Sequence, residues 1–324
     1  MTCPALDRPV ALRLSVTDHC QLRCVYCRTG AVEASPARSR PLEVASLVRF
    51  VAIAQARFGV EKVRLTGGEP LLRHDLVDLV GALASAGVAD LALTTNGQRL
   101  SGLAAPLLHA GLRRVNVSLD SVSSSSFRAM ARGGRPELTV SGIDEALRVG
   151  LRPLKLNAVI LRGINDAEAE DLVTFALERG CELRFIELMP TGLSPEEFAR
   201  RHVPAGELLE RLGRSLQIDP LPEDRGSSSR RYSVRDRAGR TGVVGMIAPM
   251  SHRFCDGCRR LRLTADGALI GCLARKESWP IGELLREPGP TAERAVVEVM
   301  ERALGCKRSS ERFEPALRMS SIGG

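Results

Sequence analysis

Aromatic residues are scarce in this 324-residue chain, which holds one Trp, two Tyr and eight Phe, 3% in all. Hydrophobic residues make up 44%, so a sizeable core has to be built from Leu, Val, Ala and Ile. No apolar run approaches the roughly 20 residues that a membrane-spanning helix needs. There is also no lysine-rich run interleaved with aromatic residues, as RNA-binding modules have. These absences predict a protein that binds neither membrane nor nucleic acid.

The first residues also lack the features of a secretory signal. Residues 1–9 show no charged start followed by an apolar stretch and a small-residue cleavage site. We therefore predict a cytoplasmic location. The formal net charge is +8, from 46 Lys and Arg against 38 Asp and Glu, and the basic residues are spread along the chain. This distribution favours a small polyanionic substrate.

Nine cysteines are present, and in a reducing compartment spaced cysteines bind metals more often than they form disulfides. Six of them form a first cysteine group, Cys20, Cys24 and Cys27, and a second cysteine group, Cys255, Cys258 and Cys272. The remaining three stand alone and are interpreted as ordinary free thiols: Cys3, Cys181 and Cys306.

Strand and helix patterns alternate through the first two thirds of the chain. Strands are predicted at residues 10–16, 62–66, 90–95, 114–119, 154–160 and 182–188, with helices such as 41–58, 74–86 and 166–178 between them. Six βα units imply a parallel sheet with right-handed crossovers. We predict an α/β fold: a partial (β/α)6 TIM-like barrel over residues 1–215, and a β-rich C-terminal region over residues 216–324.

In this C-terminal region, short strands are predicted at residues 232–235, 241–247 and 260–264, and a last helix near 291–304. Polar motifs in the barrel follow the ends of predicted strands: the first cysteine group, then residues 67–70, 95–97 and 118–120. Since βα barrels bind ligands at the C-terminal ends of their strands, these motifs predict one shared site.

The first cysteine group has the spacing C-x3-C-x2-C. Thiolates are the usual ligands of iron–sulfur clusters, and three of them leave one iron of a four-iron cluster open. The alternative is a structural zinc site, which needs a fourth ligand such as His19.

The second cysteine group also offers three thiolates. A zinc knuckle completed by His252 or Asp256 competes with a second cluster on spacing alone. The adjacent Arg260-Leu261-Arg262 puts two guanidinium groups on one face of a strand, where they suit phosphate oxygens. Three thiolates beside two arginines predict an anion site at an open metal position.

The first cysteine group resembles the signature of the radical S-adenosylmethionine superfamily, and Gly67-Gly68-Glu69-Pro70 resembles its glycine motif. Other segments resemble the GTP 3′,8-cyclase family of molybdenum cofactor biosynthesis, over residues 10–324. They are 254–267 (FCDGCRRLRLTADG), 271–273 (GCL), 12–18 (LRLSVTD), 64–73 (RLTGGEPLLR), 116–120 (NVSLD), 155–159 (KLNAV), 184–190 (RFIELMP) and the closing Gly323-Gly324.

The resemblance implies two [4Fe-4S] clusters, one on each cysteine group. Positions matching S-adenosylmethionine contacts are Tyr26, Gly68, Ser118 and Met189. Positions matching GTP contacts are Arg13, Arg64, Thr95, Lys155, Arg260, Leu261 and Arg262. The catalytic set is expected to be Arg13, Arg260, Arg262, Gly323 and Gly324, the last two on a tail that enters the site. The alternative for this tail is an unimportant chain end.

The same resemblance implies the reaction. A 5′-deoxyadenosyl radical removes hydrogen from carbon 3′ of the GTP ribose, and the ribose radical attacks carbon 8 of guanine. One further electron and a proton then give (8S)-3′,8-cyclo-7,8-dihydro-GTP. The implied partners are an electron donor protein and, downstream, cyclic pyranopterin monophosphate synthase. A homodimer is an open alternative to a monomer.

Three positions depart from the family pattern. Arg28-Thr29 stands where Met-Pro is usual, and Arg259 where Asn is common; both changes add charge near the site. Two other functions were weighed. A two-cluster maturase acting on peptides would be expected to have a longer cysteine-rich tail and a peptide-binding domain. A zinc-binding RNA module would hold zinc and no iron.

Overall fold

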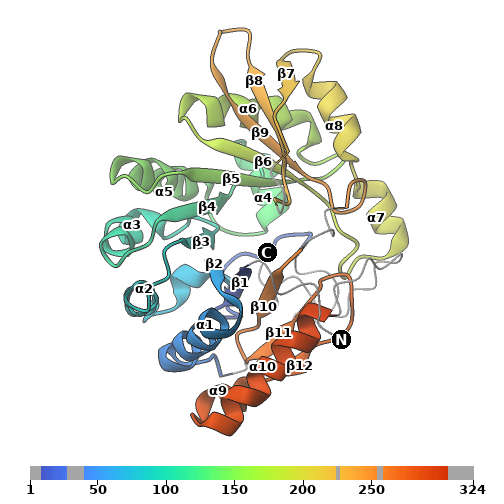
Figure 1. The fold of residues 1–324 in the computed structure, drawn as a ribbon. Coiled ribbons are helices and arrows are strands. Elements are labelled where there is room, and N and C mark those ends of the chain that lie inside the picture. Colours follow the sequence, from blue (N-terminus) through green and yellow to red (C-terminus); the bar gives the residue numbers. More distant parts are fainter. Residues whose placement is uncertain (1–8, 28–39, 224–226, 254–257, 306–324) are drawn as a thin grey trace.

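Strands of alternating polarity run through the centre of the protein and form one curved sheet. The computed structural model describes residues 9–27, 40–223, 227–253 and 258–305 (Figure 1). Its twelve-stranded sheet has the order β12-β11-β10-β1-β2-β3-β4-β5-β6-β9-β8-β7. The first six strands are β1 (Val10–Ser15), β2 (Val60–Thr66), β3 (Leu91–Thr95), β4 (Arg114–Ser118), β5 (Leu154–Ile160) and β6 (Glu182–Glu187). The predicted six βα units and partial barrel are confirmed.

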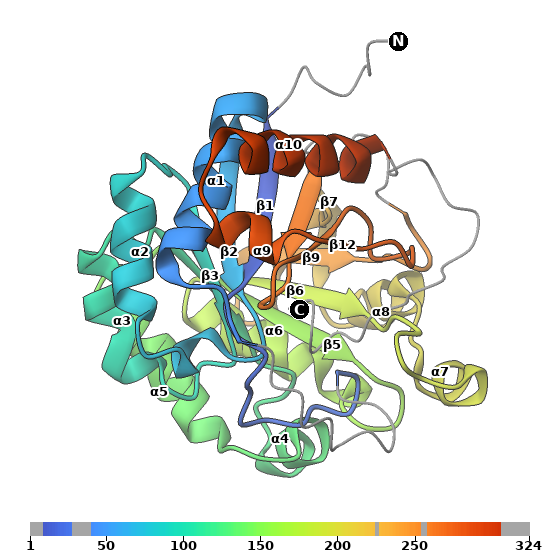
Figure 2. The same cartoon turned by 90° about the horizontal axis from the view of Figure 1, so that it is seen from below.

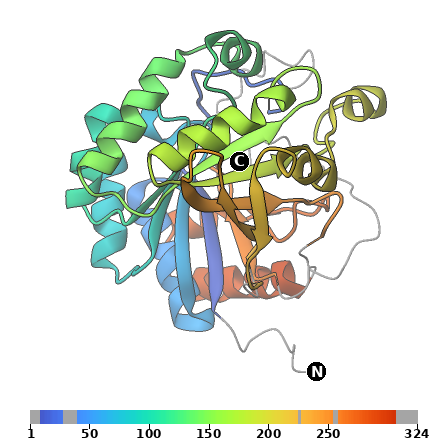
Figure 3. The same ribbon diagram turned by 90° about the horizontal axis from the view of Figure 1, so that it is seen from above.

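Helices connect these strands and cover the outer side of the sheet, as the view from above shows (Figure 3). They are α1 (Val44–Phe58), α2 (Leu76–Ser85), α3 (Leu100–His109), α4 (Ser124–Ala131), α5 (Pro136–Arg148) and α6 (Ala169–Glu178), with short 3-10 helices η1 (Pro70–Leu72) and η2 (Asp166–Glu168). The prediction for α1 began three residues early. Residue 43 has an extended backbone, and the N–H of Leu42 donates to Ala265 O at 2.8 Å.

The parallel part of the sheet is larger than six strands. Two strands of the C-terminal region, β9 (Thr241–Ile247) and β10 (Arg260–Leu263), pair in parallel with β6 and β1. These pairings satisfy the backbone N–H and C=O groups of β1 and β6 that would stay unpaired at the edges of a six-stranded barrel. Among the strand pairs of the described residues, β9 and β10 do not pair with each other, so the barrel stays open between them.

The other elements lie outside these eight strands. They are α7 (Pro195–Arg201), α8 (Ala205–Leu212), β7 (Gln217–Pro220), β8 (Arg230–Arg235), β11 (Ala268–Ile270), β12 (Trp279–Pro280), α9 (Gly282–Arg286) and α10 (Pro290–Gly305). The last helix lies beside α1 (Figure 2), and Arg57 of α1 donates to Glu301 of α10 over 2.8 Å. In the described ranges, no helix combines the length and apolar character needed to cross a membrane.

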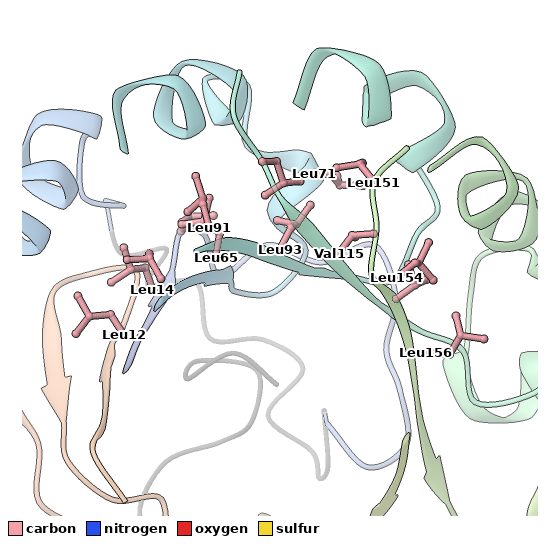
Figure 4. Packing of buried hydrophobic residues seen from close by; sticks show 14 of the residues in the cluster. Leu12, Leu14, Leu65, Leu71, Leu91, Leu93, Val115, Leu151, Leu154 and Leu156 are labelled. Atoms are coloured by element: carbon pink, nitrogen blue, oxygen red, sulfur yellow. The ribbon is translucent and has the colours of Figure 1, made fainter. Parts of the chain in front are cut away.

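The core lies between the sheet and the helices. Leu65, Leu93 and Val115 point from the strands toward the helix layer and are fully buried (Figure 4). Because successive residues of a strand point to opposite faces, their neighbours Arg64 and Asn116 lie on the inner face of the barrel. Burial of apolar surface on the outer face therefore leaves the inner face free for polar side chains.

Arg73 connects the end of β1 to the segment before α1. Its guanidinium Nη1 donates to the carbonyl oxygens of Val16 (3.0 Å) and Leu42 (2.9 Å), and its Nε and Nη2 bind the carboxylate of Asp75 (2.6 and 3.0 Å). The arginine side chain is 7% exposed. Since the first cysteine group follows Val16 closely, this contact fixes where its loop begins.

Replacing Arg73 by alanine should lower the free energy of unfolding by about 2–4 kcal/mol, because buried carbonyls and Asp75 lose a charged donor. Arg73 also holds the pKa of Asp75 below its ordinary 3.8. The Arg73–Asp75 pair therefore adds its full stabilisation to the free energy of unfolding above pH 3.8. This stabilisation is lost as pH falls through the lowered pKa of Asp75. Urea denaturation at several pH values measures both effects. Arg148→Ala, which breaks an exposed pair with Glu145, is the control and should change little.

Candidate active site

The first cysteine group lies in the loop that follows the C-terminal end of β1. Its three thiols are half-buried, and none of them forms a disulfide within the described residues. The backbone N–H groups of Arg23 and Val25 donate to the carbonyl oxygens of Ala131 and Met130, each over 2.9 Å. These bonds hold the loop against the end of α4, so the backbone between the cysteines is anchored to the barrel.

The electrostatics of these thiols suit a cationic metal centre. Burial raises the pKa of the Cys24 thiol well above its ordinary value of 9.0, and Asp120 and the other two thiols raise it further. Three thiolates close together repel one another, and positively charged iron offsets that repulsion. The donor set therefore fits an iron–sulfur cluster.

Zinc and an iron–sulfur cluster require different arrangements of the thiols. A single zinc ion needs its ligands to converge on one point, whereas each thiolate of a four-iron cluster binds its own iron. His19, the candidate fourth zinc ligand, has Nε2 3.8 Å from Oδ1 of Asp18.

The glycine motif packs directly against the start of the cysteine loop. Gly68 N donates to Thr17 O over 2.7 Å, and Glu69 N donates to His19 O over 2.6 Å. A Cβ atom would lie 2.4 Å from Thr17 O at Gly67 and 2.2 Å from His19 O at Gly68. Only glycine permits this approach, so the structure brings together two motifs that lie forty residues apart in sequence.

A buried carboxylate holds the glycine motif in place. Glu69 accepts hydrogen bonds from Leu71 N (3.0 Å), Asn96 N (2.7 Å) and Thr95 Oγ1 (2.6 Å). Burial raises the pKa of Glu69 to about 7, although these donors lower it. The Thr95 hydroxyl also accepts from Gly97 N at 3.0 Å. Thr95, predicted to contact GTP, therefore has its hydroxyl engaged within the protein.

Residues predicted to contact S-adenosylmethionine lie on the same rim as the first cysteine group. Ser118 ends β4, Met189 follows β6, and Tyr26 donates from its hydroxyl to Oδ2 of Asp120 over 2.8 Å. Asp120 also accepts from Val159 N at 2.8 Å, and burial raises the pKa of Asp120 to about 6. Parallel strands bring these separate segments to one edge of the barrel.

One further polar group on this rim was not predicted to bind a ligand. Asn157 of β5 is the register partner of Ser118. Its Oδ1 is buried and has no hydrogen-bond partner among the described residues. A buried acceptor of this kind needs a donor from beyond the described residues, and the hydroxyl or amino groups of a ligand would suit it.

A row of arginines occupies the inner face of the barrel. Arg13 of β1 is the register partner of both Arg64 of β2 and Arg262 of β10. Burial lowers the pKa of all three arginines, and repulsion from neighbouring arginines lowers it further. The pKa falls to about 9 for Arg64 and to about 10 for Arg262, and that of Arg13 is lowered as well. The charge of Arg260 acts on all three. This concentration of positive charge on the inner face favours the binding of an anion.

The row continues through Lys155, which was predicted to contact GTP, and through Arg114 and Arg184, which the sequence analysis did not select. Lys155 donates to Glu182 Oε2 over 2.8 Å, and Arg184 donates to Glu182 Oε1 over 2.6 Å. Arg184 and Arg114 both lower the pKa of Arg64, so they face the same space. Arg114 and Arg184 each alternate with core residues along their strands, as in Glu182-Leu183-Arg184. This alternation was the signal that could have identified both arginines.

Cys258 and Cys272, the described members of the second cysteine group, lie at the other end of the strands. Cys258 precedes β10, whose first residue pairs with Ala11 near the start of β1. The Cys258 thiol raises the pKa of Arg13 and Arg262, and the Cys272 thiol raises that of Arg262. Two members of this group therefore lie near the arginines. His252, a candidate zinc ligand, is exposed.

Several predicted positions can be placed only in part. Leu261 has a fully buried side chain in the core, so only its backbone can reach a ligand. Cys181 is a buried free thiol, and burial raises its pKa to about 11, as suits an inert cysteine. The following lie outside the described residues: Cys3, Arg28, Thr29, Cys255, Asp256, Cys306, Gly323 and Gly324.

Two protein families match this chain in succession. Residues 14–176 match the Radical SAM superfamily, and residues 181–313 match Molybdenum Cofactor Synthesis C. The first match contains the first cysteine group, the glycine motif and Lys155. The second contains Met189, Arg260, Arg262 and the second cysteine group.

Similar whole proteins carry the name GTP 3′,8-cyclase. The one from Paenarthrobacter nicotinovorans is 41% identical over 289 residues, 86% of this chain and 81% of its own. Those from Saccharophagus degradans and Listeria monocytogenes are 38% identical, over 93% and 97% of this chain and 90% and 96% of their own. On these matches, the chain belongs to the radical S-adenosylmethionine superfamily and, within it, to the GTP 3′,8-cyclase family.

Proposed function

We propose that this chain converts GTP to (8S)-3′,8-cyclo-7,8-dihydro-GTP, the first step of molybdenum cofactor biosynthesis. The observation that carries the proposal is the arginine row on the inner face, with a cysteine group toward each end of the strands. GTP carries three phosphates, and a triphosphate supplies the negative charge that this row lacks. The names of the related proteins point to the same substrate.

Membership of the superfamily implies one [4Fe-4S] cluster and S-adenosylmethionine. The first cysteine group, Cys20, Cys24 and Cys27, would hold that cluster. When bound and reduced, this pair of cofactors supplies the 5′-deoxyadenosyl radical that takes hydrogen from ribose carbon 3′. Around it, the backbone of Gly68 and the side chains of Tyr26, Ser118 and Met189 would orient S-adenosylmethionine at the rim.

The inner face would bind the nucleotide. Arg13, Arg64, Arg260 and Arg262 offer forked donors for phosphate oxygens, which guanidinium groups bind in a bidentate manner. Lys155 would exchange its bond to Glu182 for a phosphate oxygen, and Leu261 would contribute through its backbone. By orienting the ribose and excluding water, these residues would favour attack of carbon 3′ on carbon 8 over side reactions.

The second cysteine group, Cys255, Cys258 and Cys272, would hold a second [4Fe-4S] cluster that presents the purine. Three thiolates would leave one iron open for the base, and Arg262 lies near Cys258 and Cys272. We also propose the division into residues 1–215 and 216–324, the electron donor protein and the role of Gly323 and Gly324 in the site. The cytoplasmic location and the alternative of a homodimer stay predictions.

Anaerobic reconstitution with iron and sulfide tests the proposal directly. The reconstituted chain is incubated with GTP, S-adenosylmethionine and dithionite, and the nucleotide products are identified by mass spectrometry. The cyclised dihydro-GTP, together with 5′-deoxyadenosine, is the expected result. Formation of 5′-deoxyadenosine without a cyclised nucleotide would contradict the assigned substrate.

Cys20→Ser should abolish cleavage of S-adenosylmethionine, because a cluster with two protein thiolates no longer presents the correct open iron. Release of 5′-deoxyadenosine, measured by chromatography, reports this loss. Cys181→Ala is the matched control, since Cys181 is a buried thiol outside both cysteine groups, and it should retain release. Undiminished release from Cys20→Ser would remove this cysteine from the cluster.

Arg262→Ala should weaken GTP binding by about 1.5–3 kcal/mol, the range for a charged hydrogen bond. Isothermal titration of the reconstituted chain measures the dissociation constant. Arg148→Ala provides the control, because Arg148 is exposed on α5 and pairs with Glu145. An affinity equal to that of the unmodified chain would place Arg262 outside the substrate site.

Arg64→Met should make the ligand-free chain more stable while weakening its response to triphosphate. Since the pKa of Arg64 is lowered to about 9, its charge destabilises the fold below that pH, and the cost fades as pH rises through it. The measurement is the melting temperature at neutral pH with and without inorganic tripolyphosphate, at constant ionic strength. A less stable variant with an unchanged tripolyphosphate response would contradict this account.

A further inference from the structure

The inner face of the barrel carries a further arginine beyond the row on β1 to β6. Arg231 lies in β8, where it is the register partner of Gly245 in β9. Gly245 is in turn the register partner of Arg184 in β6. Residues directly opposite each other on neighbouring strands point to the same face of a sheet. Arg231 and Arg184 therefore share the inner face, with a glycine between them.

The packing of β8 and β9 agrees with this orientation. Tyr232 and Val244 are register partners, and Val244 is buried in the hydrophobic core while Tyr232 packs against it. Successive side chains of a strand point to opposite faces. The side chain of Arg231, next to Tyr232, consequently points away from the core and toward the interior of the barrel.

The missing side chain of Gly245 leaves room that Ser229 fills. A Cβ atom at Gly245 would lie 2.2 Å from Ser229 Oγ and 3.2 Å from Arg184 Cγ. The Ser229 hydroxyl thus lies over the backbone of β9, beside Arg184. Ser229 is 7% exposed, and its buried Oγ has no hydrogen-bond partner within the ranges that the structure describes. Leaving such a group unpaired is unfavourable, so it favours a ligand that bonds to it.

The Arg231 guanidinium has a similar need. Its Nε is buried and lacks a hydrogen-bond partner among the described residues. The neighbouring Arg230 differs, because it is exposed on the opposite face of β8 and pairs with Glu223 over 3.1 Å. The Nε–H and the terminal NH2 groups of a guanidinium form a planar fork that matches phosphate oxygens. A buried donor and a buried hydroxyl on one face therefore describe an oxyanion subsite.

We propose that Arg231 and the Ser229 hydroxyl form a further phosphate-binding subsite, which takes the phosphate of the triphosphate farthest from the base. Figure 1 shows β8 and β9 on one side of the opening of the barrel, and β10 to β12 on the other. Since the base belongs near Cys258 under the proposed function, the part of the nucleotide that reaches β8 is its terminal phosphate. The inference rests on the proposed function for GTP as the ligand, whereas the subsite for an oxyanion follows from the two unpartnered groups.

The test compares Arg231→Met with Arg230→Met in the reconstituted full chain. Both variants remove one positive charge from the same strand, but only Arg231 faces the interior. Isothermal titration with inorganic tripolyphosphate at constant ionic strength gives the dissociation constant. Arg231→Met should weaken binding by roughly tenfold or more, since a charged hydrogen bond is lost, and Arg230→Met should change it little. Equal weakening by both variants would show that net charge alone matters and would overturn the proposal, as would an unchanged affinity in Arg231→Met.

Ser229→Ala provides a second test that leaves every charge in place. It should weaken tripolyphosphate binding by roughly threefold, because one neutral hydrogen bond is lost. An unchanged affinity would remove Ser229 from the subsite and overturn the pairing of the two groups.

GTP and GDP test which phosphate is bound. Arg231→Met should weaken GTP binding about as much as tripolyphosphate binding and should leave GDP binding nearly unchanged. An equal loss for both nucleotides would contradict the assignment of the terminal phosphate. If the unmodified chain formed no cyclised nucleotide, the tripolyphosphate comparison would still report the subsite, so this inference and the proposed function can fail separately.

Discussion

Positive charge concentrated on the inner face of the barrel is the constraint on which the rest of the structure depends. Strand pairing places Arg13, Arg64 and Arg262 side by side, at the spacing of adjacent strands of roughly 4.8 Å. Such groups repel one another and lose hydration, which opposes folding. The buried leucines and valines of the outer face offset this cost. Under the proposed function, an anionic substrate would offset the repulsion that remains.

The strands also set the distance between the first cysteine group and Cys258. The first group lies beyond the C-terminal end of β1, and Cys258 lies beside the N-terminal end of the same strand. A strand is rigid compared with a loop, so the space between them is defined by the length of β1. Buried side chains such as Glu69 and Arg73 fix the loop of the first group to the strands.

Much of the barrel and of the candidate site could be predicted from sequence, because alternation along a strand shows which side chains face the core. The six strands and the parallel barrel were predicted this way, and so was the meeting of the cysteine and glycine motifs. Arg114 and Arg184 show the same alternation and were not selected, since a single arginine in a strand does not reveal its neighbours. Leu261 was selected because its position matches a GTP contact of the family, although its side chain faces the core.

The sequence by itself determined the cysteine spacing, the glycines that permit close approach and the order of strands and helices, because these depend on residues close together in the chain. The tertiary structure decided that β9 and β10 extend the parallel sheet, that Lys155 pairs with Glu182, and that Glu187 accepts from the backbone of Met250 and Ser251. Such contacts join residues 27 to 249 positions apart. They depend on register and packing across the whole barrel, which no local pattern contains.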